Sequence, residues 1–190
     1  MIFIFLGAPG AGKGTQADMA ASSQGWIHLS TGDVLREEVA KESDLGQAAN
    51  EYMSRGDLVP DRLMVDMVAG RLAELNVDDV LLLDGFPRSR PQAEALAEAL
   101  KTRAGGSGGV GSALYFRAPE SVLTARLLGR GRKDDREDVI QNRLRVYSET
   151  TEPLVAYYRE QGLLVEIDAD RTVEEIQADV LDRIGAVLPH

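Results

Sequence analysis

The residues best suited to chemistry form a glycine-rich turn near the start of the chain, Gly7-Ala8-Pro9-Gly10-Ala11-Gly12-Lys13-Gly14-Thr15. An unbroken apolar run, Met1 to Leu6, precedes this turn, and a segment of helical character follows it. A turn between a buried strand and a helix points successive backbone N–H groups into one concavity, and the helix dipole adds partial positive charge there. Lys13 can then reach the outer phosphates of a polyphosphate, and Thr15 offers a hydroxyl near an inner phosphate or a metal ion. The turn therefore predicts a polyphosphate site.

A carboxylate follows a second apolar run. Val80 to Leu83 predicts a buried strand, and Asp84 stands at its end. Beside a phosphate loop, a carboxylate at the end of such a strand can hold Mg²⁺, directly or through water. Asp84 is therefore the candidate metal ligand, and an ordinary turn residue is the alternative interpretation.

Positive charge is concentrated in one window of an otherwise acidic chain. The formal net charge is −10, whereas the window from Arg126 to Arg145 contains more basic than acidic residues. A guanidinium group binds phosphate oxygens in pairs. The window thus favours a small anionic ligand, and the overall charge disfavours nucleic acid. A solvated helix face is the alternative.

A parallel sheet is needed to bring these residues together. Short apolar runs also occur at Trp26–Leu29, Ala113–Phe116 and Leu163–Ile167. Helical patterns lie between the runs at Thr31–Lys41, Asp44–Ser54 and Asp61–Leu75, and Thr172 with Glu175 predicts a capping box before a last helix. This alternation predicts an α/β three-layer sandwich, with a five-stranded parallel sheet flanked by helices. Ligands of such sheets bind at the carboxyl ends of the strands, where the phosphate loop and Asp84 fall.

Length and composition indicate one domain, residues 1–190, because 190 residues with 44% hydrophobic content can bury one sizeable core. The sequence contains no cysteine, which excludes disulfides and thiolate metal sites and favours a cytoplasmic location. The opening apolar run is too short for a membrane span and lacks the basic start of a signal peptide. We expect the tract Gly105 to Gly111 to be a flexible surface loop. His28 and His190 are interpreted as core or surface residues.

Five motifs together resemble the adenylate kinase family: GAPGAGKGTQ, LSTGDVLR, GDLVPDRLM, LLDGFPRSRPQAEAL and GRGRKDDREDVIQNRLRVY. They occur in the family's order and spacing and, with weaker similarity between them, cover nearly the whole chain. Gly14 before Thr15 also departs from the GTPase pattern and is typical of small nucleotide kinases. The resemblance implies a P-loop nucleoside monophosphate kinase, which transfers the terminal phosphoryl group of ATP to AMP, gives two ADP and maintains the adenine nucleotide pool. It further implies a cytoplasmic monomer that uses Mg²⁺ with ATP, without zinc and without a nucleic-acid or membrane partner.

The resemblance also assigns residues to two nucleotide sites. The catalytic charges would be Lys13, Arg36, Arg88, Arg130, Arg132 and Arg143. The ATP site would contain Gly10, Ala11, Gly12, Lys13, Gly14, Thr15, Arg126, Arg130 and Arg171. The AMP site would contain Thr31, Arg36, Asp57, Leu58, Val59, Gly85, Phe86, Pro87, Arg88, Gln92, Arg132 and Arg143. In these sites Arg126 would stack near the ATP base, and Gln92 would read the adenine edge of AMP.

Two segments would move over the substrates. Residues 30–59 would be the mobile monophosphate-binding segment, and residues 129–135 would be a lid over ATP. Only Gly131 separates Arg130 from Arg132, so the chain lacks the inserted hairpin and metal-binding cysteines of longer lids. Asp134 and Asp135 match an acidic pair of the family.

Three other functions are alternatives. A pyrimidine monophosphate kinase typically has Ala where Thr31 stands and an Asn-rich stretch where this chain has Ser89 to Gln92. A nucleotide switch or sensor would bind without transfer, although the sequence contains no Asn-Lys-x-Asp guanine motif. A small-metabolite kinase that shares only the phosphate loop would leave LSTGDVLR and GFPR unexplained. The sequence does not distinguish ATP from GTP as donor, and it does not determine the oligomeric state.

Overall fold

Five parallel strands, in the order β2-β3-β1-β4-β5, form the central sheet of the computed structural model. Their bounds are β1 (Ile2–Gly7), β2 (Ile27–Ser30), β3 (Leu81–Asp84), β4 (Val110–Arg117) and β5 (Leu164–Asp168). The structure describes residues 1–76, 78–102, 109–132 and 135–188. Each predicted apolar run overlaps one of these strands, so the parallel sheet is confirmed.

Helices connect the strands and cover the sheet. Within the described ranges they are α1 (Lys13–Gln24), α2 (Thr31–Ala40), α3 (Asp44–Met53), α4 (Asp61–Ala73), α5 (Arg90–Thr102), α6 (Glu120–Arg130), α7 (Glu137–Val146), a π-helical turn η2 (Tyr147–Thr151), α8 (Pro153–Glu160) and α9 (Val173–Gly185). The predicted capping box of α9 is present, because Thr172 Oγ1 accepts from Glu175 N and a Glu175 carboxylate oxygen accepts from Thr172 N. Each cap satisfies a backbone N–H that the first helical turn leaves unpaired.

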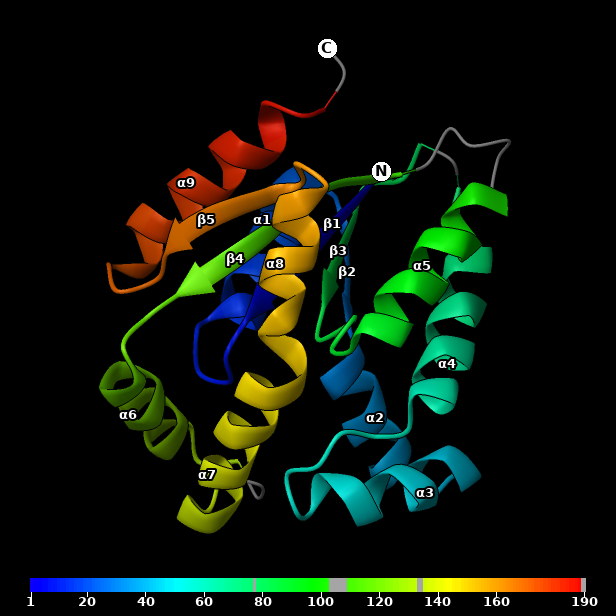
Figure 1. Cartoon of the computed structure of the whole chain (residues 1–190), viewed down its shortest axis with the longest axis vertical. Helices are drawn as coiled ribbons and strands as arrows, with labels where there is room; N and C mark the ends of the chain where they lie inside the picture. Colours follow the sequence, from blue (N-terminus) through cyan, green and yellow to red (C-terminus); the bar gives the residue numbers. More distant parts are fainter. Residues whose placement is uncertain (77, 103–108, 133–134, 189–190) are drawn as a thin grey trace.

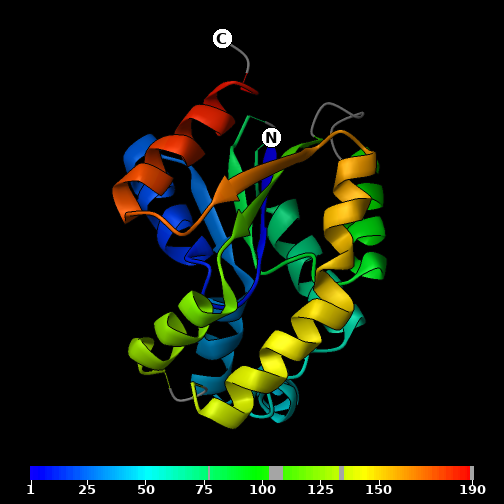
Figure 2. The same ribbon diagram turned by 60° about the vertical axis from the view of Figure 1, so that its left-hand side comes forward.

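Successive side chains of β1 point to opposite faces of the sheet, so the core has two layers. Ile2, Ile4 and Leu6 pack with side chains of α4, α5 and α8 on one face of the sheet. Phe3 and Phe5 point to the other face and pack with α1 and α9. Figures 1 and 2 show the sheet between these two helical layers. A strand buried on both faces is apolar at every position, which explains the unbroken run at the start of the chain.

The tract from Gly105 to Gly111, predicted to be a loop, differs from that prediction at its last two residues. Residues 105–108 of the predicted loop lie outside the described residues, but Val110 and Gly111 belong to β4, where Val110 pairs with Ile2. The prediction of a loop there is wrong because pairing with β1 extends β4. A Cβ at Gly111 would lie 2.9 Å from the Phe3 ring, so the glycine lets the backbone pack on that side chain.

The register brings three chain segments to one end of the sheet. Asp84 pairs with Phe5 of β1 on one side and with Ser30 of β2 on the other. The phosphate loop, the start of α2 and the residues after β3 therefore meet beyond the same edge. Figure 1 shows α2 and α3 to one side of this end and α6 and α7 to the other. The carboxyl ends of the strands thus open into a space between two helical segments.

Candidate active site

The phosphate loop passes from β1 to α1 through backbone conformations that favour glycine. Gly10 and Gly12 both have φ of 88°. A Cβ at Gly10 would lie 2.6 Å from the carbonyl oxygen of Leu123 in α6, so the loop packs tightly against that helix. Lys13 is the first residue of α1, and its Nζ donates to the carbonyl oxygens of Gly7 and Ala8 at 2.8 and 3.0 Å. The loop therefore encloses its own lysine at a helix N-terminus, the arrangement that binds phosphate.

A cleft of about 490 Å³ collects the predicted cations. These cations come from widely separated elements of the chain, and all of them line the cleft: Lys13, Arg36, Arg88, Arg126, Arg130, Arg132 and Arg143. Burial lowers the pKa of Lys13 to about 8; Asp84 opposes this change, and three of the arginines reinforce it. Burial also lowers the pKa of Arg88, against the attraction of Asp84. Positive groups held this close to one another indicate a site for a highly charged anion.

Two carboxylates contact four of the cleft arginines. Asp135 accepts from Arg130 at 2.9 and 2.6 Å and from Arg143 at 3.3 Å, and its side chain is 1% exposed. Burial would raise the pKa of Asp135, but hydrogen bonds from Arg130 and the Arg132 backbone N–H, with the charges of Arg130 and Arg143, lower it. Asp33 bonds Arg36 and lies 3.7 Å from Arg132. Each carboxylate therefore joins arginines that point into the cleft.

Asp84 lies at the floor of the cleft, with a side chain 14% exposed. A Cβ at Gly14 would lie 3.3 Å from the Asp84 carboxylate, so the strand end touches the first turn of α1. The Nε2 atom of His28 lies 4.0 Å from the same carboxylate, while its Nδ1 is 2.7 Å from Asp18. The largely buried His28 thus lies beside the site, which its sequence context did not indicate.

Arg88 is positioned by its backbone and by its guanidinium group. Its Nε donates to the Gly85 carbonyl at 2.7 Å, and its own carbonyl accepts from Thr151 Oγ1 at 2.8 Å. Gly85 has φ of 80°, and a Cβ there would lie 2.6 Å from Thr31 Oγ1. A larger residue at this turn would therefore displace either Thr31 or Arg88.

Six predicted site residues do not line the cleft: Thr31, Asp57, Val59, Phe86, Gln92 and Arg171. Gln92 is buried, and both ends of its amide have partners, since Nε2 donates to Asp61 at 2.7 Å and Oε1 accepts from Arg88 N at 2.8 Å. Arg171 donates to Asp179 at 2.7 Å. The roles assigned to these six residues stay predictions. Lys133 and Asp134 of the predicted lid lie outside the described residues.

Several residues that position the site carry no chemical signal in the sequence. Asp33 and Asp61 occur inside the motifs LSTGDVLR and GDLVPDRLM, but the spacing alone does not reveal which arginine or amide they hold. Asn142 of α7 donates to the Arg55 carbonyl at 2.7 Å and to Asp57 at 2.9 Å, which joins the two sides of the cleft. Such contacts cross more than eighty positions of the chain. Only the folded chain places these partners together.

Among the described residues, no group of three or more His, Asp or Glu side chains forms a metal cluster. A Mg²⁺ ion that binds mainly to substrate phosphates and water needs only one or two protein carboxylates. Asp84 is suited to that role by its oxygen ligands and its position at the cleft floor. No described helix has the length and apolarity that a membrane crossing requires.

Comparison with known proteins identifies relatives of the whole fold. A family model described as "Adenylate kinase" matches residues 5–163. The chain is 48% identical to an adenylate kinase of Synechococcus sp. (strain CC9902) over 91% of this chain and 92% of that protein. It is 44% identical to an adenylate kinase of Trichodesmium erythraeum (strain IMS101) over 97% of each chain. An adenylate kinase of Leuconostoc mesenteroides is also 44% identical, over 93% of each chain.

Proposed function

Because the chain belongs to the adenylate kinase family, as its motifs indicated, we propose how its cleft carries out that family's reaction. The chain is a nucleoside monophosphate kinase, and the family's reaction is phosphoryl transfer between ATP and AMP. The observation that carries the assignment of residues is the convergence of Lys13 and the arginines on one cleft at the phosphate loop. Phosphoryl transfer requires no protein nucleophile. It requires alignment of the two substrates and neutralisation of their charge.

On the donor side, the phosphate loop from Gly10 to Thr15 would bind the ATP phosphates through its backbone N–H groups. Lys13 would leave its two loop carbonyls and contact the outer phosphates. Arg126 borders the cleft from α6 and would stack on the ATP base, whereas Arg171 would contribute only through nearby backbone. Arg130, held by Asp135, would face the phosphates from the lid side.

On the acceptor side, Arg36 and Arg88 would grip the AMP phosphate between α2 and the turn after β3. Leu58, Gly85 and Pro87 line the same part of the cleft and would enclose the nucleotide. Thr31, Asp57, Val59, Phe86 and Gln92 would support this pocket from behind. Gln92 would reach the adenine edge only after exchanging one of its present partners, because its amide bonds Asp61 and Arg88 N.

Mg²⁺ would neutralise charge on the ATP phosphates. Asp84 would hold its hydration shell, since a carboxylate buried beside the phosphate loop suits a hard cation that keeps most of its waters. Thr15 lines the same cleft, and its hydroxyl would supply a further oxygen near the metal. The chain's own contribution is to orient both phosphate chains and to surround them with fixed guanidinium groups.

Water must be kept from the transferring group because it is a competing acceptor. We assign this role to residues 30–59 and residues 129–135. Asp33 in the first segment and Arg132 in the second lie 3.7 Å apart, so charges on the two segments meet across the cleft. Arg132 and Arg143 would complete the charge around the phosphates once both segments close.

Steady-state rates of ADP formation with AMP, UMP and CMP as acceptors, and with ATP and GTP as donors, test the proposal. We expect AMP with ATP to give the highest kcat/KM. A preference for UMP or CMP would support the pyrimidine kinase alternative, and binding without ADP formation would support a sensor. A bisubstrate dinucleoside polyphosphate should bind tightly at one site per chain, because it would occupy both halves of the cleft.

A cytoplasmic monomer is the cellular form that we propose. The net charge of −10 favours solubility and opposes close association of identical chains. Sedimentation of the purified protein at micromolar concentration tests the monomer.

A further inference from the structure

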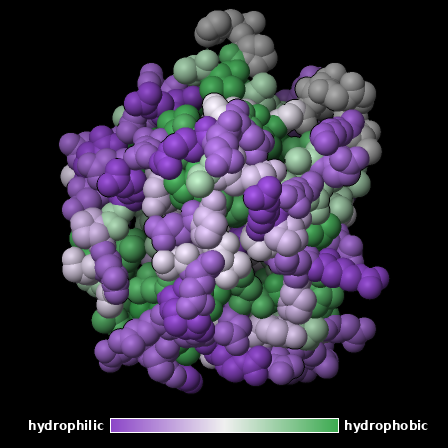
Figure 3. Space-filling view, in the orientation of Figure 1, coloured by the Kyte–Doolittle hydropathy of each residue, from purple (hydrophilic) through white to green (hydrophobic). Residues whose placement is uncertain are grey.

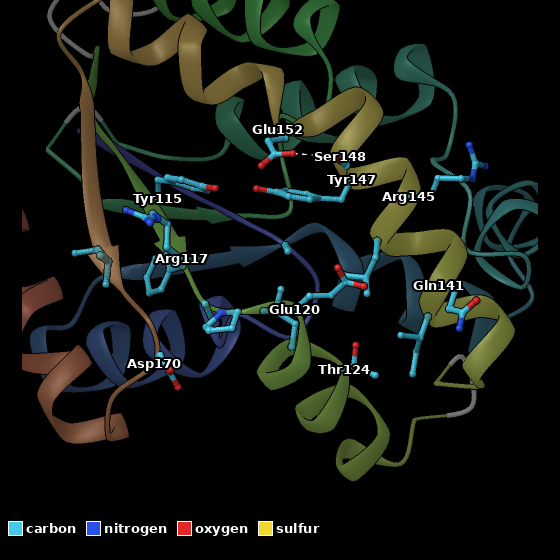
Figure 4. A pocket seen from close by; sticks show the side chains of 18 of the residues that line it. Tyr115, Arg117, Glu120, Thr124, Gln141, Arg145, Tyr147, Ser148, Glu152 and Asp170 are labelled. Atoms are coloured by element: carbon cyan, nitrogen blue, oxygen red, sulfur yellow. Dashed lines mark hydrogen bonds between the residues drawn. The ribbon is translucent and has the colours of Figure 1, made fainter.

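A second cavity lies between the sheet and the outer faces of α6 and α7, on the other side of these helices from the nucleotide cleft, and Tyr147 lines both. Its volume is about 1430 Å³. Figure 4 shows it bordered by Tyr115 and Arg117 of β4, by Glu120 and Thr124 of α6, and by Gln141 of α7. We call this cavity the outer groove. Its lining includes Glu137, Gln141 and Leu144 of the motif GRGRKDDREDVIQNRLRVY, which have no role in the two predicted nucleotide sites.

The outer groove and the nucleotide cleft share helices. On α6, Arg126, Leu127 and Arg130 line the cleft, whereas Glu120, Thr124 and Leu128 line the outer groove. On α7, Arg143 lines the cleft, and Gln141 and Leu144 line the outer groove. The two sites are therefore back to back. A molecule in the outer groove would touch the same helices that carry three of the cleft arginines.

Apolar surface is exposed in the outer groove. Leu128 is 53% exposed, the largest value among the large hydrophobic side chains that the structure describes. Leu144 and Tyr147 of the adjoining helices and Pro119 at the start of α6 lie around the same cavity. Figure 3 shows apolar side chains over α6 within a polar surface. A lone exposed leucine has little meaning, but one that borders a large cavity with other apolar groups marks a binding surface.

The rim of the outer groove is acidic. Six carboxylates line it against two guanidinium groups: Glu120, Glu137, Glu152, Glu166, Asp168 and Asp170 against Arg117 and Arg145. Both arginines are neutralised, Arg117 by Glu166 at 3.0 Å and Arg145 by Glu149 at 2.6 Å. Glu120, Glu137 and Asp170 form no ion pair with any residue that the structure describes. The groove therefore presents unneutralised negative charge around an apolar floor.

We propose that the outer groove is a docking site for a basic amphipathic helix of a protein partner. A helix about 10 Å wide and three turns long occupies on the order of 1300 Å³, so the groove, which is open to solvent on one side, has room to seat one face of such a helix and exceeds a typical small-ligand pocket. The apolar face of the helix packs on Leu128 and Leu144, and its Lys and Arg residues meet the acidic rim. A second copy of this chain is disfavoured as the occupant, because its net charge is −10.

Occupation of the outer groove restrains α6 and α7 from outside. Since Arg130 and Arg143 stand on these helices, the partner changes the mobility of the lid arginines and hence the affinity for nucleotide. Linkage requires the reverse effect as well, so that bound nucleotide changes the affinity for the helix by the same factor. The docking site is in this way coupled to the nucleotide cleft, and Tyr147, which lines both, is a direct contact between them.

Binding of a labelled synthetic peptide to the full chain, measured by fluorescence anisotropy, tests the proposal. The probe is a helix of roughly 20 residues with Leu at i, i+3, i+4 and i+7 and Lys elsewhere. Leu128→Glu should weaken binding at least about tenfold, since it places a charge against the apolar face. Val187→Glu is the matched control, because Val187 is an exposed apolar residue outside the groove lining, and it should leave the Kd unchanged within about twofold.

The acidic rim is tested by a second pair of substitutions. The double variant Glu120→Lys/Glu137→Lys should weaken the peptide at least about tenfold at low salt, with a smaller effect at high salt. A scrambled peptide of the same composition should bind much more weakly than the amphipathic one.

Three results would overturn the proposal. The scrambled peptide, or spermine alone, could bind as tightly as the helix, which would indicate attraction to any polycation. Leu128→Glu could leave the Kd unchanged. The apparent Kd of the peptide could rise in proportion to the concentration of a bisubstrate dinucleoside polyphosphate without levelling off, which is direct competition and would place the peptide in the nucleotide cleft, whereas linkage between two sites gives a change that levels off. Binding is read directly, so none of these results depends on the assigned kinase chemistry.

Discussion

Replacing Asp135 by Asn would remove the negative charge that joins two arginines of the cleft. Asp135 accepts hydrogen bonds from Arg130, Arg143 and the Arg132 backbone, and its side chain is nearly inaccessible to solvent. Asn has almost the same shape, so the change leaves the packing in place and removes mainly the charge. Its amide would also direct N–H groups toward guanidinium groups that are themselves donors.

The expected cost follows from the burial of the three partners. Removing one member of a fully buried ion pair costs about 3–5 kcal/mol. Arg130 and Arg143 are 30% and 19% exposed, so water partly replaces the lost carboxylate. We therefore expect a loss of about 2 kcal/mol in the free energy of unfolding, which is a shift of about 1 M in the urea midpoint. Catalytic efficiency should fall about tenfold to a hundredfold, because the arginines lose their fixed orientation.

Asp138→Asn is the matched control. Asp138 also bonds an arginine, Arg136, at 2.8 Å, but both side chains are about two-thirds exposed. Exposed pairs of this kind contribute little, so neither the urea midpoint nor the ADP-forming activity should change measurably. Urea unfolding followed by circular dichroism and coupled ADP formation give the two readouts. Equal behaviour of the Asp135 and Asp138 variants would refute the reasoning.

The same variant has a predictable pH dependence. The folded-state pKa of Asp135 is lowered from its ordinary 3.8, so the folded protein binds fewer protons than the unfolded chain near that pH. The stabilisation by Asp135 is therefore fully present above about pH 4 and is lost as the pH falls through the folded-state pKa. The difference in stability between the wild type and Asp135→Asn should shrink below pH 3.8. A difference that stays constant down to pH 2 would contradict this assignment.

Three further outcomes are expected. Arg88→Ala should lower kcat/KM by about a hundredfold or more, which corresponds to roughly 3 kcal/mol of transition-state stabilisation, without unfolding the protein. A loss below about tenfold would show that Arg88 is not part of the active site. Because the pKa of Lys13 in the free protein is lowered to about 8, kcat/KM for ATP should decrease as the pH rises through that value. The variant Lys13→Arg should be less active, and its decrease in kcat/KM should occur at higher pH. Asp61→Ala should raise the KM for AMP several-fold while the KM for ATP changes little, because Asp61 holds Gln92. Equal changes in the KM for AMP and the KM for ATP would contradict a role of Asp61 limited to the acceptor side.

The sheet and the phosphate loop could be predicted because their signals are local. The run from Met1 to Leu6 is apolar at every position, as a strand buried on both faces must be. The glycine spacing from Gly7 to Gly12 before Lys13 requires the backbone geometry of a phosphate cradle, whatever the rest of the chain does. The capping box at Thr172 is local in the same way.

Predictions failed or stayed incomplete where a distant partner decides the outcome. Val110 and Gly111 have the composition of a loop, yet pairing with β1 places them in β4. His28 is interpreted from the sequence as a core or surface residue, and its neighbour Asp84 comes from a strand more than fifty positions later. Gln92 is predicted to read the adenine edge of AMP, and only the fold shows that Asp61 of α4 holds its amide.

The sequence alone determined the order of the elements, the family and the identity of the charged residues that could bind phosphate. Which carboxylate holds which arginine was decided only by the tertiary structure, as Asp135 with Arg130 and Arg143 illustrates. The outer groove was equally hidden, since it is formed by one side of α6 and one side of α7 after both have packed beside β4. The physical reason is that backbone geometry depends on neighbouring residues, whereas ion pairs and cavities depend on distances between segments that only the fold establishes.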